Sequence, residues 1–240
     1  MRDVREDSEK KSRTRAICLA GSAVMAVSGC LILGFGVNDA SLNVSQAEDT
    51  ESVAVNDAGL KVAPAPDEEF RNESCSLEPG AHRPNLDPGE LSIPGNEIET
   101  TLRASEDLTL PAAPNGMIYE GSPDLGSDEG KTVTAGHVDY APGVRSGQGG
   151  ELSPWGRMHE VDPCQRVYAA NEKGEVHEFV VTDKFVVGKQ DLENSGVFTE
   201  SGDHKMVMVT CSGESVEDAG EEFQFDYSHN LVIEAVEVKA

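Results

Sequence analysis

Two residues of this chain are suited to covalent chemistry, a cysteine and a histidine that each follow a short apolar or β-branched segment. Cys211 ends the apolar run that begins at Met206. His137 follows the β-branched residues 131–134 and comes directly after a glycine. A cysteine nucleophile needs a nearby imidazole that exchanges protons with it and with the leaving amine. Together the two residues predict a thiol enzyme, although a single cysteine of this kind is typical of a small core side chain.

Strands are the elements that must position this pair. From about Leu86 onward, short apolar or β-branched segments alternate with turn signals, which predicts an all-β barrel or sandwich. The clearest hairpin joins residues 165–170 to residues 175–181, and Gly174 in its turn supplies the positive φ that a tight turn needs. Residues 154–161 are expected to form one short helix. Both members of the candidate pair should then lie where a strand runs into a loop.

The charge balance excludes a large class of functions. The chain has 240 residues, with 44 Asp and Glu against 19 Lys and Arg, and its formal net charge is -25. A polyanion of this strength is repelled by phosphate backbones, so we expect no nucleic-acid partner. The length suits one ordinary domain with appendages.

The N-terminal region has the charge pattern of a membrane anchor. Residues 1–15 carry six basic and four acidic side chains, whereas the twenty-two residues from Ala16 to Val37 carry no charge. A helix of that length spans roughly 33 Å, which is enough to cross a hydrocarbon core of about 30 Å. Because the basic residues precede the apolar run, we expect residues 1–15 to be a cytoplasmic tail and residues 16–37 a single transmembrane helix in the cell membrane. The rest of the chain is then extracellular.

Two other fates of the apolar segment stay open. Residues 27–30 look like a lipobox, in which Cys30 would be lipidated and the preceding peptide removed. The apolar residues after Cys30 favour an uncleaved anchor, because lipoproteins normally turn polar at that point. Release of the protein by a general signal peptidase is the third alternative.

Residues 38–83 are acidic and rich in Ala, Ser and Pro, with no sustained hydrophobic period. We interpret them as an acidic disordered linker, followed by a folded extracellular domain at residues 84–240. In an oxidising exterior, Cys75 and Cys164 could form a disulfide between linker and domain, and this question stays open. The spacing of His and Cys matches no metal site, so we expect no metal and no other cofactor.

The segments around the candidate pair resemble a known family. Residues 134–140, TAGHVDY, and residues 206–213, MVMVTCSG, are similar to the two signature segments of bacterial sortases, particularly the actinobacterial class F type. Their order and approximate separation match as well, and weaker similarity extends over about residues 86–238. The resemblance implies an all-β fold, an eight-stranded sortase-type β-barrel with one or two short helices, preceded by the N-terminal transmembrane helix.

The resemblance also implies an activity, that of a membrane-anchored cysteine transpeptidase. Cys211 would attack the carbonyl of a Thr-Gly bond in an LPXTG-like sorting signal, and His137 would protonate the departing amine. An amine acceptor on a cell-wall precursor or on another protein would then resolve the thioester. The implied partners are secreted proteins with a C-terminal sorting signal, in a Gram-positive cell wall, and the lipid bilayer around residues 16–37.

One position departs from the family pattern. Sortases carry an arginine on the strand after the cysteine loop, commonly within Tyr-Arg-Asp-Asn in class F, but this chain has Ser228 there and no arginine after Cys211. Losing an oxyanion donor typically costs about 10² to 10³ in turnover. The candidates for oxyanion or substrate contacts are Thr210, Ser228 and His229, although alternation along a strand would point His229 away from the thiol. The alternative function is therefore a catalytically impaired sortase-fold pseudo-enzyme that acts as a surface binding module.

Other charged residues bear on the same site. Acidic residues crowd the segment after Cys211, beginning with Glu214. Such a run is usually a solvated face, but close to the thiol it would favour imidazolium at His137. The arginines that we consider able to reach the site from loops are Arg145, Arg157 and Arg166.

Overall fold

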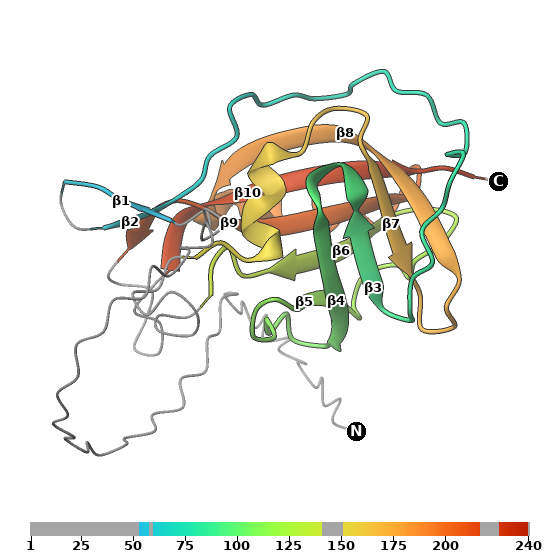
Figure 1. Cartoon of the computed structure of the whole chain (residues 1–240), viewed down its shortest axis with the longest axis horizontal. Helices are drawn as coiled ribbons and strands as arrows, with labels where there is room; N and C mark the ends of the chain where they lie inside the picture. The colour runs from blue at the N-terminus through green and yellow to red at the C-terminus, as the bar shows by residue number, and fades with distance from the viewer. Residues whose placement is uncertain (1–52, 58–59, 141–150, 217–225, 240) are drawn as a thin grey trace, which may run out of the picture.

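The computed structural model describes residues 53–57, 60–140, 151–216 and 226–239, which form a β-barrel with short helices (Figure 1). The strands are β1 (Ala54–Val55), β2 (Lys61–Ala63), β3 (Glu90–Ile93), β4 (Ile98–Ser105), β5 (Gly116–Tyr119), β6 (Lys131–Gly136), β7 (Arg166–Ala170), β8 (Val176–Gly188), β9 (Lys205–Val216) and β10 (Asp226–Glu237). The helices, all of the 3-10 type, are η1 (Pro94–Asn96), η2 (Pro154–Glu160) and η3 (Lys189–Asn194).

Eight of the strands close into the barrel. Their order is β9-β10-β8-β7-β3-β4-β5-β6, and the parallel pairing of β6 with β9 completes the ring. Closure removes the unpaired edges that an open sheet would present to other chains. The expected all-β, eight-stranded barrel is confirmed, with three short 3-10 helices in the described ranges where one or two helices were expected.

The expected hairpin is the connection between β7 and β8. Asn171 orders its turn, because its Oδ1 accepts hydrogen bonds from the backbone N of Lys173 and of Glu175 at 2.9 and 3.0 Å. Gly174 has a φ of 78°, the left-handed value expected for this turn. The short helix expected at residues 154–161 is η2.

Side chains of β9 alternate between two apolar clusters. Met206 and Met208 point into the barrel, where they belong to the same cluster as the fully buried Trp155 of η2. Val209 points to the opposite face of the sheet and belongs to a second cluster. Because successive side chains of a strand alternate, Cys211 shares the outer face with Val209.

β9 changes its partner along one edge, and this change determines where Cys211 lies. β6 pairs in parallel with the first part of β9, and the register ends with Ala135 opposite Val209. β2 pairs with β9 further along the same edge, with Ala63 opposite Gly213. Cys211 lies between these two pairings, at the point where β6 leaves the sheet.

The segment before the barrel differs from the expected disordered linker. Residues 60–83, called the strap below, run along the outside of the barrel past β8 before the chain enters β3 (Figure 1). Phe70 is only 7% exposed and forms a β-bridge with Lys184. Cys75 forms a disulfide with Cys164, with a Cα–Cα distance of 5.3 Å. These anchors are single residues separated by polar ones, so no hydrophobic period reveals them in the sequence.

Within the ranges that the structure describes, no helix combines the length and the apolar character needed to cross a bilayer. The expected cytoplasmic tail, transmembrane helix and lipobox cysteine all precede residue 53 and lie outside the described residues, as does the first part of the expected linker. These assignments stay predictions.

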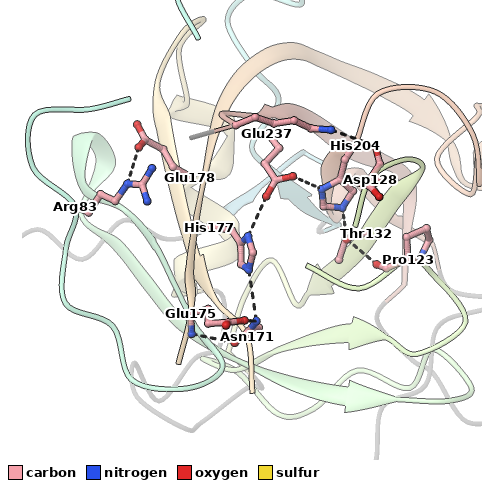
Figure 2. Close-up of polar contacts among 11 residues, drawn as sticks. Arg83, Pro123, Asp128, Thr132, Asn171, Glu175, His177, Glu178, His204 and Glu237 are labelled. Carbon is pink, nitrogen blue, oxygen red and sulfur yellow. Dashed lines mark hydrogen bonds and ion pairs between the residues drawn. The ribbon is translucent and has the colours of Figure 1, made fainter. Parts of the chain in front are cut away.

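A polar network ties strands together at the end of the barrel away from Cys211. Figure 2 shows Glu237 between two histidines, with its carboxylate 2.9 Å from His177 Nδ1 and 2.8 Å from His204 Nδ1. His204 Nε2 in turn lies 2.9 Å from Thr132 Oγ1. Burial acts to raise the pKa of Glu237, but the hydrogen bonds from His204 and His177 lower it below its ordinary value. The network joins the ends of β6, β8, β9 and β10 and so fixes the frame that carries the candidate site.

Candidate active site

Cys211 opens on a groove along the outer face of the barrel. The groove lies between η3, β6, β9 and β10 and has a volume of about 770 Å³. This volume is in the range of ligand-binding pockets, and the half-buried thiol lines it. The apolar part of the lining includes Leu108, Leu110, Met117, Val133 and Phe198.

The backbone register brings together the two segments that carry His137 and Cys211. The parallel pairing of β6 with β9 ends two residues before the candidate pair on each strand. One step further, Thr210 Oγ1 donates a hydrogen bond to the carbonyl of Gly136 at 3.0 Å, so the two segments are still in contact there. Within the described residues, the lining of the groove includes Cys211 and omits His137, whose side chain is half-buried. The topology thus brings the two segments together, with the thiol on the groove and the imidazole partly enclosed at the strand end.

The helix η2 holds the backbone of His137 in place. A Cβ on the preceding Gly136 would lie 2.3 Å from atoms of the Trp155 indole ring, so only glycine fits there. Ser153 caps η2 by accepting hydrogen bonds from two backbone N–H groups of that helix. Its hydroxyl also donates to the carbonyl of His137. The sequence does not reveal the contact between Ser153 and His137, because a serine before a proline indicates only a helix N-cap.

The electrostatic setting of His137 is dominated by burial. Burial lowers the pKa of His137, and the carboxylate of Asp139 acts in the opposite direction. Asp139 Oδ2 lies 2.9 Å from Lys61 Nζ of β2 and accepts a hydrogen bond from the Tyr227 hydroxyl at 3.3 Å. Burial, followed by the charges of Asp139 and Cys211, raises the pKa of Tyr227, so its hydroxyl stays protonated. The lowered pKa of His137 is opposite to the effect expected from acidic residues, and it favours a neutral imidazole that can accept the thiol proton.

We predict that Asp139→Asn shifts the acid limb of the pH profile, the range in which the rate of Cys211 acylation falls as the pH is lowered, to lower pH. The amide removes the negative charge that opposes burial, so the pKa of His137 should fall further below its ordinary value of about 6.5. A lower pKa keeps the imidazole neutral, and able to take the thiol proton, down to a lower pH. The measurement is the rate of Cys211 acylation against pH, with the exposed Asp87→Asn as control. An acid limb that stays in place or moves upward would contradict the prediction.

β10 passes Cys211 with a bulge that decides which side chains face the thiol. Asn230 is the direct partner of Cys211, and the register shifts between Tyr227 and His229. Ser228 and Asn230 both line the groove with Cys211, whereas His229 is exposed and lies outside the lining. The bulge breaks the alternation from which the orientation of His229 was expected, and a Cβ on Gly213 would lie 2.6 Å from Ser228 Oγ and 2.8 Å from His229 Nδ1. Asn230 was not among the sequence candidates, and only the pairing of β9 with β10 reveals its position.

The arginines considered for the site are engaged elsewhere. Arg157 pairs with Glu160 at 3.1 Å on η2, and Arg166 pairs with the buried Glu178 at 2.7 Å. Neither of them lines the groove. Arg145 lies outside the described residues. Among the described residues, therefore, no arginine reaches the groove from any element.

The remaining candidates are also accounted for. Thr210 lines the groove, but its hydroxyl already donates a hydrogen bond to the backbone carbonyl of Gly136 in β6. Lys189, at the start of η3, is a cationic residue of the lining. Glu214 is exposed and accepts a hydrogen bond from Asn56 at 3.1 Å, while residues 217–225 of the acidic segment lie outside the described ranges.

Across the part of the chain that the structure describes, no group of three His, Cys, Asp or Glu side chains could hold a metal ion.

Comparisons with known proteins match the sequence of the barrel to one family. A family model described as a sortase domain matches residues 91–238. Among curated proteins, none matches the chain. One similar solved structure is sortase A from Corynebacterium diphtheriae, with a TM-score of 0.47 and 17% identity, covering 63% of this chain and 60% of that chain. A lid mutant of sortase A from Corynebacterium diphtheriae has a TM-score of 0.48 and 18% identity, covering 67% of this chain and 73% of that chain. Sortase C2 of Group B Streptococcus Pilus Island 1 is similar at a TM-score of 0.45 and 19% identity, covering 63% and 73% of the two chains. This chain therefore spans less than two thirds of the length of the first of these proteins.

Proposed function

This chain belongs to the sortase family, and from that premise we propose that it is a cysteine transpeptidase that cleaves a sorting signal and transfers its acyl group to an amine. One observation carries the proposal. Cys211 lines a groove at the point where β6 leaves β9, and β6 pairs with β9 up to two residues before His137 and Cys211. This pairing brings the segment of a candidate base close to that of a candidate nucleophile on the groove, which supports covalent catalysis.

In the proposed reaction, the thiol proton passes to the neutral imidazole of His137 as the sulfur adds to the carbonyl of a Thr-Gly bond. The tetrahedral intermediate then collapses, and the imidazolium returns a proton to the departing glycine amine. The acyl group stays on Cys211 as a thioester. A second amine, on a cell-wall precursor or on another protein, attacks the thioester while His137 accepts its proton, and the thiol is regenerated.

The groove suits an extended peptide with apolar residues ahead of the cleaved bond. Its apolar lining, which includes Leu110, Val133 and Phe198, belongs to the same groove as the thiol. Apolar lining with a few polar groups near the reacting atom is the usual form of a ligand site. We therefore propose an LPXTG-like signal on secreted proteins as the substrate, with the Leu-Pro portion in the apolar part.

The cellular setting is part of the same proposal. We propose that residues 16–37 anchor the protein in the membrane of a Gram-positive cell, with the N-terminus in the cytoplasm and the domain outside. The class F subtype is proposed on the residues around His137 and Cys211 alone. The acidic segment ahead of the strap then separates the domain from the bilayer.

The proposal is tested by a covalent adduct. On incubation with a sorting-signal peptide, the wild-type protein should gain the mass of the acyl fragment on Cys211 and release the glycine-containing fragment. Cys211→Ala should form no adduct, because Cys211 is the free cysteine of the described part of the chain and lines the groove. A wild-type protein that binds the peptide but forms no adduct would contradict the transpeptidase and favour the pseudo-enzyme, which the serine at position 228 makes the alternative.

A further inference from the structure

Asn230 has the position of a hydrogen-bond donor to the reacting carbonyl. It is the direct cross-strand partner of Cys211 in the antiparallel pairing of β9 with β10. Directly opposed residues have Cβ atoms about 4.5–5.5 Å apart and point to the same face of the sheet. The side-chain amide of Asn230 therefore reaches an acyl group attached to the sulfur.

The side chain of Asn230 is nearly buried but lines the groove. The residue is 7% exposed, and its carboxamide carries two N–H donors. Among the described residues, Asn96 Oδ1 is the buried side-chain polar atom without a hydrogen-bond partner, so the amide atoms of Asn230 are not enclosed without one. A ligand in the groove can therefore accept a hydrogen bond from this amide.

The neighbouring donors on this face are already engaged. The Thr210 hydroxyl donates to the carbonyl of Gly136, and the Tyr227 hydroxyl donates to Asp139. Ser228 lines the groove, and its Oγ lies 2.8 Å from Nδ1 of His229. Asn230 is thus the donor beside Cys211 that the described structure leaves available.

We propose that the side-chain N–H of Asn230 donates a hydrogen bond to the oxyanion that forms when Cys211 attacks a carbonyl, in the absence of the guanidinium that the family carries at the position of Ser228. The inference extends the proposed function to a further catalytic residue. A preorganised donor of this kind acts only as charge develops on the oxygen, so it lowers the barrier to acylation without tightening the binding of the ground state.

The test compares two reactions of the same thiol, one that passes through an oxyanion and one that does not. With p-nitrophenyl acetate, the sulfur adds to the carbonyl carbon and the π pair moves to oxygen; collapse then expels p-nitrophenolate and leaves an acetyl thioester. With iodoacetamide, the sulfur displaces iodide from a saturated carbon, and no oxyanion forms. Both reactions are followed at Cys211 of the full chain by peptide mass spectrometry.

Asn230→Ala is expected to slow acylation by about 10²-fold, the loss typical of a single oxyanion donor, and to leave alkylation at the wild-type rate. Asn230→Leu, which has nearly the same volume, should show the same change in the ratio of the two rates and guards against a folding defect in the alanine variant. Asn230→Gln, which keeps an amide donor on a longer side chain, should recover part of the acylation rate.

Three results would overturn the inference. Acylation of Asn230→Leu at the wild-type rate would show that the amide does not act on the oxyanion. An equal fall in both rates would show that the residue acts on the thiol or on the fold. A loss of acylation in Ser228→Ala, with none in Asn230→Ala, would assign the donor to Ser228. Neither reagent contains a sorting signal, so the effect of Asn230 can be measured even in a protein that forms no adduct with the peptide. Failure of the proposed transpeptidase function is thereby distinguished from failure of the inference about Asn230.

Discussion

Replacement of His137 by alanine is expected to slow thioester formation on Cys211 by about 10² to 10⁴-fold, the usual contribution of a positioned acid–base group. The burial that lowers the pKa of His137 keeps the imidazole neutral, so that it takes the thiol proton and then returns it to the leaving group. The measurement is the single-turnover rate of adduct formation with a sorting-signal peptide. The exposed His82→Ala is the matched control and should keep the wild-type rate.

The two roles of His137 are separated by the leaving group. An amine must be protonated as it departs, whereas p-nitrophenolate leaves without a proton. His137→Ala should therefore cost more with the peptide than with p-nitrophenyl acetate. A variant that acylates both substrates as fast as the wild type would remove His137 from the mechanism, and equal losses would limit its role to the thiol proton.

Loss of the disulfide is expected to be the largest change in stability. The double variant Cys75→Ala, Cys164→Ala opens a loop that spans 89 residues, and the chain-entropy model for such a loop gives a destabilisation of about 4–5 kcal/mol. The cross-link also holds the strap on the barrel, where Phe70 forms its bridge with Lys184. Alanine keeps the Cβ at Cys164, whose φ is 64°, so the backbone strain at that position is retained in the variant.

The measurement is the urea midpoint of unfolding. Trp155 is the single tryptophan of the chain and is fully buried in the barrel, so its fluorescence reports on the whole fold. Reductant should lower the midpoint of the wild-type protein and leave that of the double variant unchanged. Cys211→Ala provides the control for losing a thiol without a cross-link, and it should shift the midpoint far less. Equal midpoints for the oxidised wild type and the double variant would contradict the prediction.

The barrel and the candidate pair could be predicted because their signals are local. The turn at Gly174, the segment after Pro154 and the β-branched run before His137 each specify an element over a few residues. The resemblance of the segments around His137 and Cys211 to sortases then supplied the closed eight-stranded barrel, which no pattern within the chain contains.

The strap was misread because its contacts are long-range. Lys61 reaches Asp139, and Phe70 reaches β8, across many residues of sequence. Neither residue belongs to a hydrophobic period, so an acidic segment rich in Ala and Pro reads as a solvated linker. The disulfide at Cys75 was left open for the same reason, since spacing alone does not say which cysteines approach each other.

The sequence by itself determined which side chains of this protein can do chemistry, because a nucleophile and a base are recognisable by residue type and by the strands before them. Only the tertiary structure decided what surrounds the thiol. The change of partner along β9, the bulge in β10 and the pairing of Asn230 with Cys211 depend on register between strands far apart in the chain, and register follows from packing of the whole barrel.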